Sequence, residues 1–149
     1  MDIFEVIDTN VVLSAMLSHN PQSATVRVLR AIMDRKIIPL YNHEILSEYS
    51  TVLHRPQFKL KEDDVVRIIN NIIRRGQLAE RVHLDNNEVK DPKDVVFYEV
   101  ALSKEGAYVV TGNTKDFPIT PIVVTPAEMI AILEDMDLIA RITPPTNSI

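Results

Sequence analysis

The sequence predicts an α/β fold with a central, mainly parallel sheet between two layers of helices. Short apolar segments such as 3–7 and 107–111 alternate with longer segments whose apolar residues recur at helical spacing. Strands that alternate with helices pair in parallel through right-handed crossovers, and the helices then cover both sheet faces. The chain has 149 residues, the length of one such domain. We therefore predict a single three-layer α/β/α domain over residues 1–149, with 143–149 as a flexible tail.

Composition excludes several classes of protein. The absence of cysteine excludes a disulfide framework and a thiolate metal site. No apolar run approaches the ~20 residues that span a bilayer, and the first residues lack the basic start and long apolar core of a secretory signal. We therefore expect a cytoplasmic protein without membrane insertion. Because the net charge is −5, any contact with nucleic acid must depend on local basic patches or on metal ions.

The first half of the chain predicts two strands and four helices. The first strand ends at Asp8, and the second contains Pro39, which lacks an N–H group and so argues for a sheet edge or a bulge. Gly76 stops the last helix of this half. The predicted strands are 3–7 and 37–41, and the predicted helices are 11–17, one that begins at Pro21, 43–54 and 61–75.

The second half predicts a buried helix between short strands. Asp91 and Pro92 suit a helix start, and residues 95–102 are apolar almost all round, so this helix should be buried. Thr125 suits the cap of a last helix. The other predicted elements are a possible strand at 80–84, a polar loop at 85–90, strands at 107–111 and 121–125, and a helix at 126–135.

Polar residues stand at the ends of two predicted strands. Asp8 follows the first strand, where open α/β sheets bind ligands, although aspartate is equally suited to capping the next helix. Asn113 and Asp116 follow the strand 107–111, where both are also ordinary turn residues. The carboxyl ends of parallel strands meet at one edge of a sheet. These residues are therefore candidates for a shared site.

Four further acids lie on predicted helices or at their starts. Glu48 falls about 40° outside the apolar arc of its helix and borders the core, while Glu44 points farther into solvent. Asp94 shares a buried stripe with other residues of its helix, which favours a functional role, whereas Asp91 is mainly a cap. Clustered carboxylates raise one another's pKa unless a cation neutralises them. Oxygen ligands without cysteine or paired histidine suit Mg²⁺ or Mn²⁺ rather than zinc.

Several motifs of the sequence resemble those of a known family. Four segments carry the resemblance: Val6-Ile-Asp-Thr-Asn10, Glu44-Ile-Leu-Ser-Glu-Tyr49, Asp91-Pro-Lys-Asp94 and Val110-Thr-Gly-Asn-Thr-Lys-Asp-Phe-Pro118. In this order and spacing they resemble the PIN-domain family, and in particular the VapC-like toxin components of prokaryotic toxin–antitoxin pairs. The resemblance implies a parallel-sheet α/β/α fold and Mg²⁺- or Mn²⁺-dependent endoribonuclease activity on RNA. It also implies a cognate antitoxin and a homodimer.

The resemblance assigns a site to this chain. The family's acids fall on Asp8, Glu48, Asp94 and Asp116, and Asn10, Asp91, Thr111 and Asn113 are supporting residues at the margin. Many relatives carry aspartate where this chain has Asn113, so Asp116 must supply the fourth charge. We expect Asp8 and Asp94 to bind the principal ion, and Glu48 and Asp116 to orient water or a second ion.

Two other functions are compatible with parts of the pattern. A catalytically silent PIN-like module would bind RNA or a protein without cutting, and Asn113 leaves this alternative open. A phospho-receiver domain would have a second acid beside Asp8 and a lysine after a late strand, and the chain has neither. The candidates for holding flanking phosphates are Arg55, Lys59, Arg74 and Arg75, whose usual role is a solvated helix face.

Overall fold

The computed structural model describes residues 2–84 and 89–142 and confirms the predicted three-layer α/β/α fold. In these residues five parallel strands form one sheet in the order β3-β2-β1-β4-β5. The strands are β1 (Phe4–Ile7), β2 (Ile38–Tyr41), β3 (Gln77–Leu78), β4 (Tyr108–Val110) and β5 (Val123–Val124). The first strand of the chain is therefore the central strand of the sheet.

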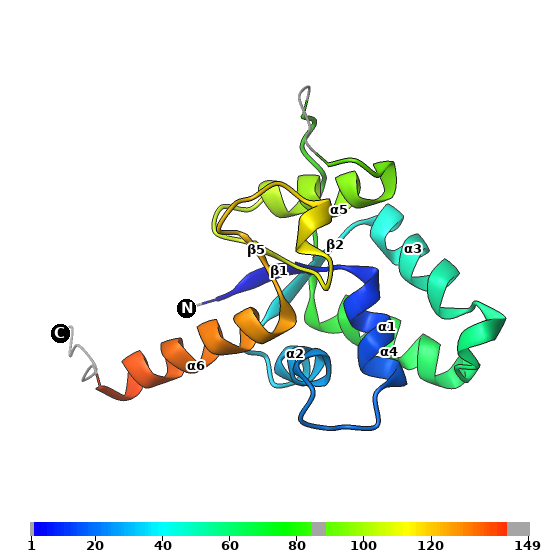
Figure 1. Ribbon diagram of the computed structural model, residues 1–149, viewed down its shortest axis with the longest axis horizontal. Coiled ribbons are helices and arrows are strands. Elements are labelled where there is room, and N and C mark those ends of the chain that lie inside the picture. The colour runs from blue at the N-terminus through cyan, green and yellow to red at the C-terminus, as the bar shows by residue number, and fades with distance from the viewer. Residues whose placement is uncertain (1, 85–88, 143–149) are drawn as a thin grey trace.

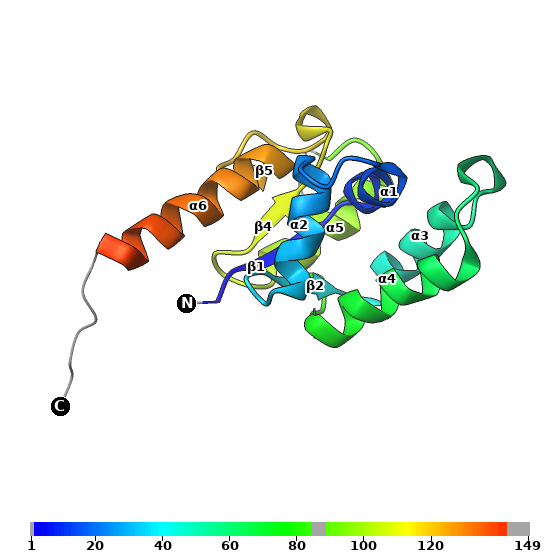
Figure 2. The ribbon, with the colours of Figure 1, turned by 90° about the horizontal axis from the view of Figure 1, so that it is seen from below.

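Helices cover both faces of this sheet. Helix α5 packs against β1, β2 and β4, and Figure 1 shows it on the opposite side of the strands from α2 and α6. The view from below in Figure 2 shows α2 in front of the strands and α5 behind them. The α-helices are α1 (Thr9–Leu17), α2 (Ala24–Met33), α3 (His43–Leu53), α4 (Glu62–Arg75), α5 (Pro92–Leu102) and α6 (Pro126–Ile142), and the short 3-10 helices are η1 (Pro56–Phe58) and η2 (Thr114–Asp116).

The two central strands are the most deeply buried part of the core. Val6 and Ile7 of β1, and Val109 and Val110 of β4, have no solvent exposure. Strands buried on both faces read as continuous apolar runs, which is why these segments were recognisable from sequence. Asp8 follows β1 directly, so the most rigid part of the sheet determines where its carboxylate lies.

The prediction that Pro39 marks an edge or a bulge is wrong, because β2 lies between β1 and β3. The missing N–H group is tolerated because β3 is short and pairs only with Leu40 and Tyr41, beyond the proline. Gly76 allows the chain that enters β3 to pass close to Pro39. A Cβ at Gly76 would lie only 2.4 Å from the carbonyl oxygen of Pro39.

The prediction of a possible strand at 80–84 is also wrong. The chain joins the sheet immediately after α4, through Gln77 and Leu78, and residues 80–84 follow as an irregular segment. Of the predicted loop 85–90, residues 85–88 lie outside the described residues, while Val89 is buried in the core. The predicted tail 143–149 also lies outside the described residues.

The last helix is longer than predicted. Helix α6 begins as expected: the Thr125 hydroxyl accepts from the Glu128 N–H at 3.1 Å, and the Glu128 carboxylate accepts from the Thr125 N–H at 2.9 Å. It continues past Asp135 to Ile142, because no proline or glycine follows Asp135 within this range. No helix in the described ranges is long and apolar enough to cross a membrane.

One carboxyl group is buried in the middle of the sheet. Glu5 on β1 is completely buried, and neither of its carboxylate oxygens has a hydrogen-bond partner among the described residues. Burial raises the pKa of this group well above its ordinary value of 4.5. The folded protein therefore holds Glu5 in its neutral form more strongly than the unfolded chain does.

The first prediction follows from this buried acid. The free energy of unfolding keeps its full Glu5 contribution below the unfolded pKa of about 4.5 and loses it as pH rises toward the raised folded pKa. We expect Glu5→Met, of similar volume, to remove this slope and to stabilise the protein by about 1–3 kcal/mol near neutral pH. Urea unfolding from about pH 5 to about pH 8 measures both effects.

Glu5→Gln is the matched control for this prediction. Glutamine removes the titrating group but keeps polar atoms without partners, so it should lose the pH slope without the gain in stability. Equal pH slopes in the wild type and both variants would contradict the assignment of the slope to Glu5.

Candidate active site

Asp8 is the best-defined polar residue at the carboxyl edge of the sheet. Its side chain is only 6% exposed and does not cap α1, although Asp8 occupies the N-cap position. Instead its Oδ2 accepts hydrogen bonds from the Thr111 hydroxyl at 2.8 Å and from the Asn10 amide at 3.1 Å. Because both donors contact one oxygen, they fix the rotation of the carboxylate. The capping interpretation of Asp8 is therefore not supported.

The loop after β4 completes this arrangement. The Asn10 side-chain oxygen accepts from the Gly112 N–H at 3.1 Å, and the Thr111 hydroxyl accepts from the Asn113 N–H at 3.0 Å. The backbone of β1 joins the same strand, since the Asp8 N–H donates to the Val110 carbonyl at 2.9 Å. Asn113 thus supports the site through its backbone, while its side chain is exposed.

The other acids lie within electrostatic reach of one another. Burial raises the pKa of Asp94 from 3.8 to about 6, and neighbouring carboxylates add to the effect. These carboxylates are, in decreasing order of effect, Asp8, Asp91, Asp116 and Glu48. The structure therefore brings all four predicted acids to one region, from the end of β1, from α3, from α5 and from η2.

Asp8 and Asp91 differ in how their surroundings act on them. Burial raises the pKa of Asp8 and Asp116 raises it further, whereas the hydrogen bonds from Thr111, the Thr9 backbone and Asn10 act in the opposite direction. The Asp91 side chain accepts from the Lys93 N–H at 3.0 Å and caps α5, as predicted. The ionised form of Asp8 thus has dedicated donors, and Asp91 is already engaged as a cap.

Tyr49 is a residue of this region that sequence analysis assigned only to the core. Its ring is fully buried beside Phe97 of α5, with centroids 6.2 Å apart, and its hydroxyl donates to the Ile7 carbonyl at 2.5 Å. Burial raises its pKa well above the ordinary value, with Asp8 and Glu5 adding to the effect. Tyr49 therefore anchors α3, which carries Glu48, to the end of β1. A tyrosine within an otherwise aliphatic arc was the only signal in the sequence.

The donor set of these acids suits a hard divalent cation. Among the described residues, no three acidic or histidine side chains lie close enough together to enclose an ion as they stand. Mg²⁺ does not require such a cage, because it keeps several waters and takes only one or two carboxylates directly. The mutual repulsion that raises the pKa of Asp94 is relieved by a cation. Asp8 and Asp94 are the residues that would hold the ion, with Glu48 and Asp116 beside them.

The predicted phosphate-binding arginines lie elsewhere. Arg74 and Arg75 line a cavity of about 510 Å³ together with Arg35 and the start of β2 at Ile37 and Ile38. This cavity is at the amino end of the parallel strands, whereas Asp8 follows the carboxyl end of β1. Arg74 and Arg75 are therefore not part of the acidic rim. The other two candidates, Arg55 and Lys59, flank η1 in the connection between α3 and α4.

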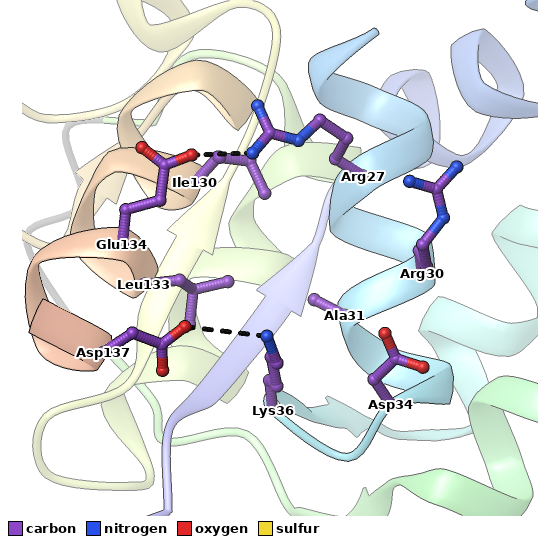
Figure 3. Close-up of a pocket in the computed structure, with 9 residues that line it drawn as sticks. All are labelled: Arg27, Arg30, Ala31, Asp34, Lys36, Ile130, Leu133, Glu134 and Asp137. Carbon is purple, nitrogen blue, oxygen red and sulfur yellow. Dashed lines mark hydrogen bonds and ion pairs between the residues drawn. The ribbon is translucent and has the colours of Figure 1, made fainter. Parts of the chain in front are cut away.

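A second cavity lies between α2 and α6. Figure 3 shows two ion pairs across it, Arg27 with Glu134 at 2.7 Å and Lys36 with Asp137 at 3.6 Å. Its volume is about 140 Å³, and none of the predicted site residues lines it. This cavity is therefore a gap between α2 and α6 that the two ion pairs bridge.

Comparison with known proteins identifies the fold and the family of the chain. A family model described as the PIN domain matches residues 5–115, which is more than half of the chain. The fold is similar to that in the crystal structure of PAE2754 from Pyrobaculum aerophilum, with a TM-score of 0.59 and 16% identity over 90% of each chain. No curated protein matches the sequence. The structural similarity shows the fold alone, but the family match extends from β1 through β4 and includes Asp8, Glu48 and Asp94. The chain therefore belongs to the PIN-domain family.

Proposed function

We propose that the protein is a Mg²⁺- or Mn²⁺-dependent endoribonuclease and the toxin component of a toxin–antitoxin pair. PIN domains are in general metal-dependent nucleases. The observation that supports this activity here is the convergence of Asp8, Glu48, Asp94 and Asp116. Burial raises the pKa of Asp94 to about 6, and repulsion from the neighbouring acids adds to this rise. The resemblance of the motifs to VapC-like proteins supports the choice of RNA and the toxin role.

Each acid has a distinct part in this proposal. Thr111 and Asn10 hold the Asp8 carboxylate at a fixed orientation, and Asp94, in the first turn of α5, lies within electrostatic reach of it. A bound divalent ion would lower the pKa of the attacking water and neutralise charge on the scissile phosphate. Glu48 and Asp116 would orient the attacking water or hold a second ion.

The activity is tested with purified protein and single-stranded RNA. We expect endonucleolytic cleavage that requires Mg²⁺ or Mn²⁺ and stops when a chelator is added. Cleavage that persists in chelator would contradict the metal-dependent mechanism. Binding of RNA without any cleavage would favour the catalytically silent alternative.

The variant Asp94→Asn tests whether Asp94 is a metal ligand or only a helix-terminal acid. The variant should unfold within about 1 kcal/mol of the wild type, because lost repulsion offsets a lost helix-dipole interaction of ~0.3–1 kcal/mol. Wild type should show a rise in melting temperature with Mg²⁺ or Mn²⁺ that the variant largely lacks, since a ligand stabilises only the form that binds it. Ribonuclease activity should fall with it.

Asp63→Asn is the matched control for this experiment. Asp63 is an exposed acid in the first turn of α4, so its loss removes a similar dipole interaction away from the proposed site. We expect its metal response and cleavage to match the wild type. If Asp94→Asn behaves like Asp63→Asn, Asp94 is only a helix-terminal residue.

We further propose a homodimer and a cognate antitoxin as partners. Apolar side chains on three helices support an apolar interface, because they are more than one-third exposed. They are Met33, Val66, Ile73, Leu138, Ile139 and Ile142. Sedimentation equilibrium should give a dimer mass at micromolar protein, and a monomer mass independent of concentration would contradict the dimer. A small neighbouring gene for a DNA-binding protein would support the antitoxin.

A further inference from the structure

The segment that follows β3, residues 79–84, is bound to the end of β2 and to α5. The Ala79 N–H donates to the Tyr41 carbonyl at 2.8 Å, and the Val82 N–H donates to the Glu99 carbonyl at 3.3 Å. The Leu84 N–H then donates to the Glu99 carboxylate at 2.8 Å. This segment, which we call the strap, is therefore held in place although it belongs to no helix or strand.

Arg81 lies at the middle of the strap and joins two helices. Its Nη1 donates to both carboxylate oxygens of Glu44 on α3, at 3.0 and 2.9 Å. Its Nε donates to Glu99 on α5 at 2.7 Å, and its Nη2 pairs with the same carboxylate at 2.5 Å. One guanidinium thus uses its fork geometry on two carboxylates from different helices, which the point charge of a lysine cannot reproduce.

The Glu99 side of this network is buried. The Glu99 side chain is 3% exposed, whereas that of Glu44 is 58% exposed. Burial alone would raise the pKa of Glu99, but the Leu84 N–H and the Arg81 guanidinium hold it below its ordinary value. Glu99 is therefore a buried carboxylate that stays ionised because Arg81 and the strap satisfy it. Breaking such a pair leaves an uncompensated buried charge.

The same two helices carry two of the acids in the candidate active site. Glu48 lies one turn after Glu44 on α3, and Asp94 lies in the first turn of α5, the helix that carries Glu99. Glu48 is among the groups that raise the pKa of Asp94, so the two helices carry charges that repel each other. Arg81 supplies an attraction between the same two helices, through Glu44 and Glu99.

We propose that Arg81 is a positioning residue that sets the separation of Glu48 and Asp94 by joining α3 to α5. The proposal rests on the function proposed above. It predicts that loss of Arg81 weakens the binding of a divalent cation to the folded protein, in addition to its effect on the stability of the fold. Replacing a residue that orients metal ligands without binding the metal itself typically lowers metal affinity by about 10–100-fold.

The test measures Mn²⁺ affinity by calorimetry and by the metal-dependent rise in melting temperature, in wild type, Arg81→Gln and Arg81→Lys. We expect Arg81→Gln to raise the Mn²⁺ dissociation constant by about 10–100-fold. Arg81→Lys should recover part of the affinity, because it restores charge without the fork. RNA cleavage by Arg81→Gln should approach the wild-type kcat at saturating Mn²⁺, with the loss confined to the metal concentration required.

Arg67→Gln is the matched control. Arg67 pairs with Asp64 on α4 at 3.4 Å, so its replacement removes an arginine and an ion pair outside the strap. Its Mn²⁺ affinity should equal that of the wild type. If Arg81→Gln does not fold, Glu44→Gln removes only the exposed half of the network and should still raise the dissociation constant, by a smaller factor.

The possible outcomes are distinct. A folded Arg81→Gln, or Glu44→Gln in its place, with wild-type Mn²⁺ affinity would overturn the positioning role while leaving the proposed nuclease intact. A wild type that shows no response to Mn²⁺ would overturn the proposed function and the role of Arg81 with it.

Discussion

The candidate site depends on the placement of several carboxylates at one edge of the sheet. Repulsion between like charges opposes this arrangement, and it adds to the effect of burial in raising the pKa of Asp94. The fold withstands it because the acids come from separate elements, each fixed by its own contacts. The central strands β1 and β4 are fully buried, so the position of Asp8 is determined by the core.

Two kinds of contact hold the helical acids near Asp8. Tyr49 connects α3 to the backbone of β1 and packs beside Phe97 of α5. Arg81 connects the same two helices from the strap by charge-assisted hydrogen bonds. The Tyr49 contact lies within the apolar core, and the Arg81 contact lies at the margin of the core. Because α3 and α5 are held together at both places, repulsion between Glu48 and Asp94 can separate them only to a limited extent.

The sequence was sufficient to predict the architecture and the positions of the acids. Continuous apolar runs such as 107–111 identify strands covered on both faces, and residues at their carboxyl ends must share an edge. Pro39 and segment 80–84 were misjudged for one reason. Strand β3 has only two residues, Gln77 and Leu78, and so short a strand has no periodicity to detect. Its presence depends on the close passage at Gly76, which is a tertiary property.

The supporting contacts of the site were harder to predict than the acids. Thr111 and Asn10 meet at Asp8 because β1 and β4 are neighbours, although the residues are separated by about a hundred positions. Glu99 is the one acid within the apolar stretch 95–102, but nothing in the sequence identifies Arg81 as its partner.

The difference between the acids and their supports has a physical origin. In an open α/β sheet the residues that bind ligands follow the carboxyl ends of strands, and the ends of secondary-structure elements can be located from local sequence. A residue that supports a ligand acts through a partner distant in sequence, such as Arg81 with Glu44 and Glu99. Buried charge is the clue that remains, because a carboxylate such as Glu99 stays ionised in the core only with a cation or several donors beside it. Glu5 shows the opposite case: its carboxyl group has no partner among the described residues, and the fold favours its neutral form.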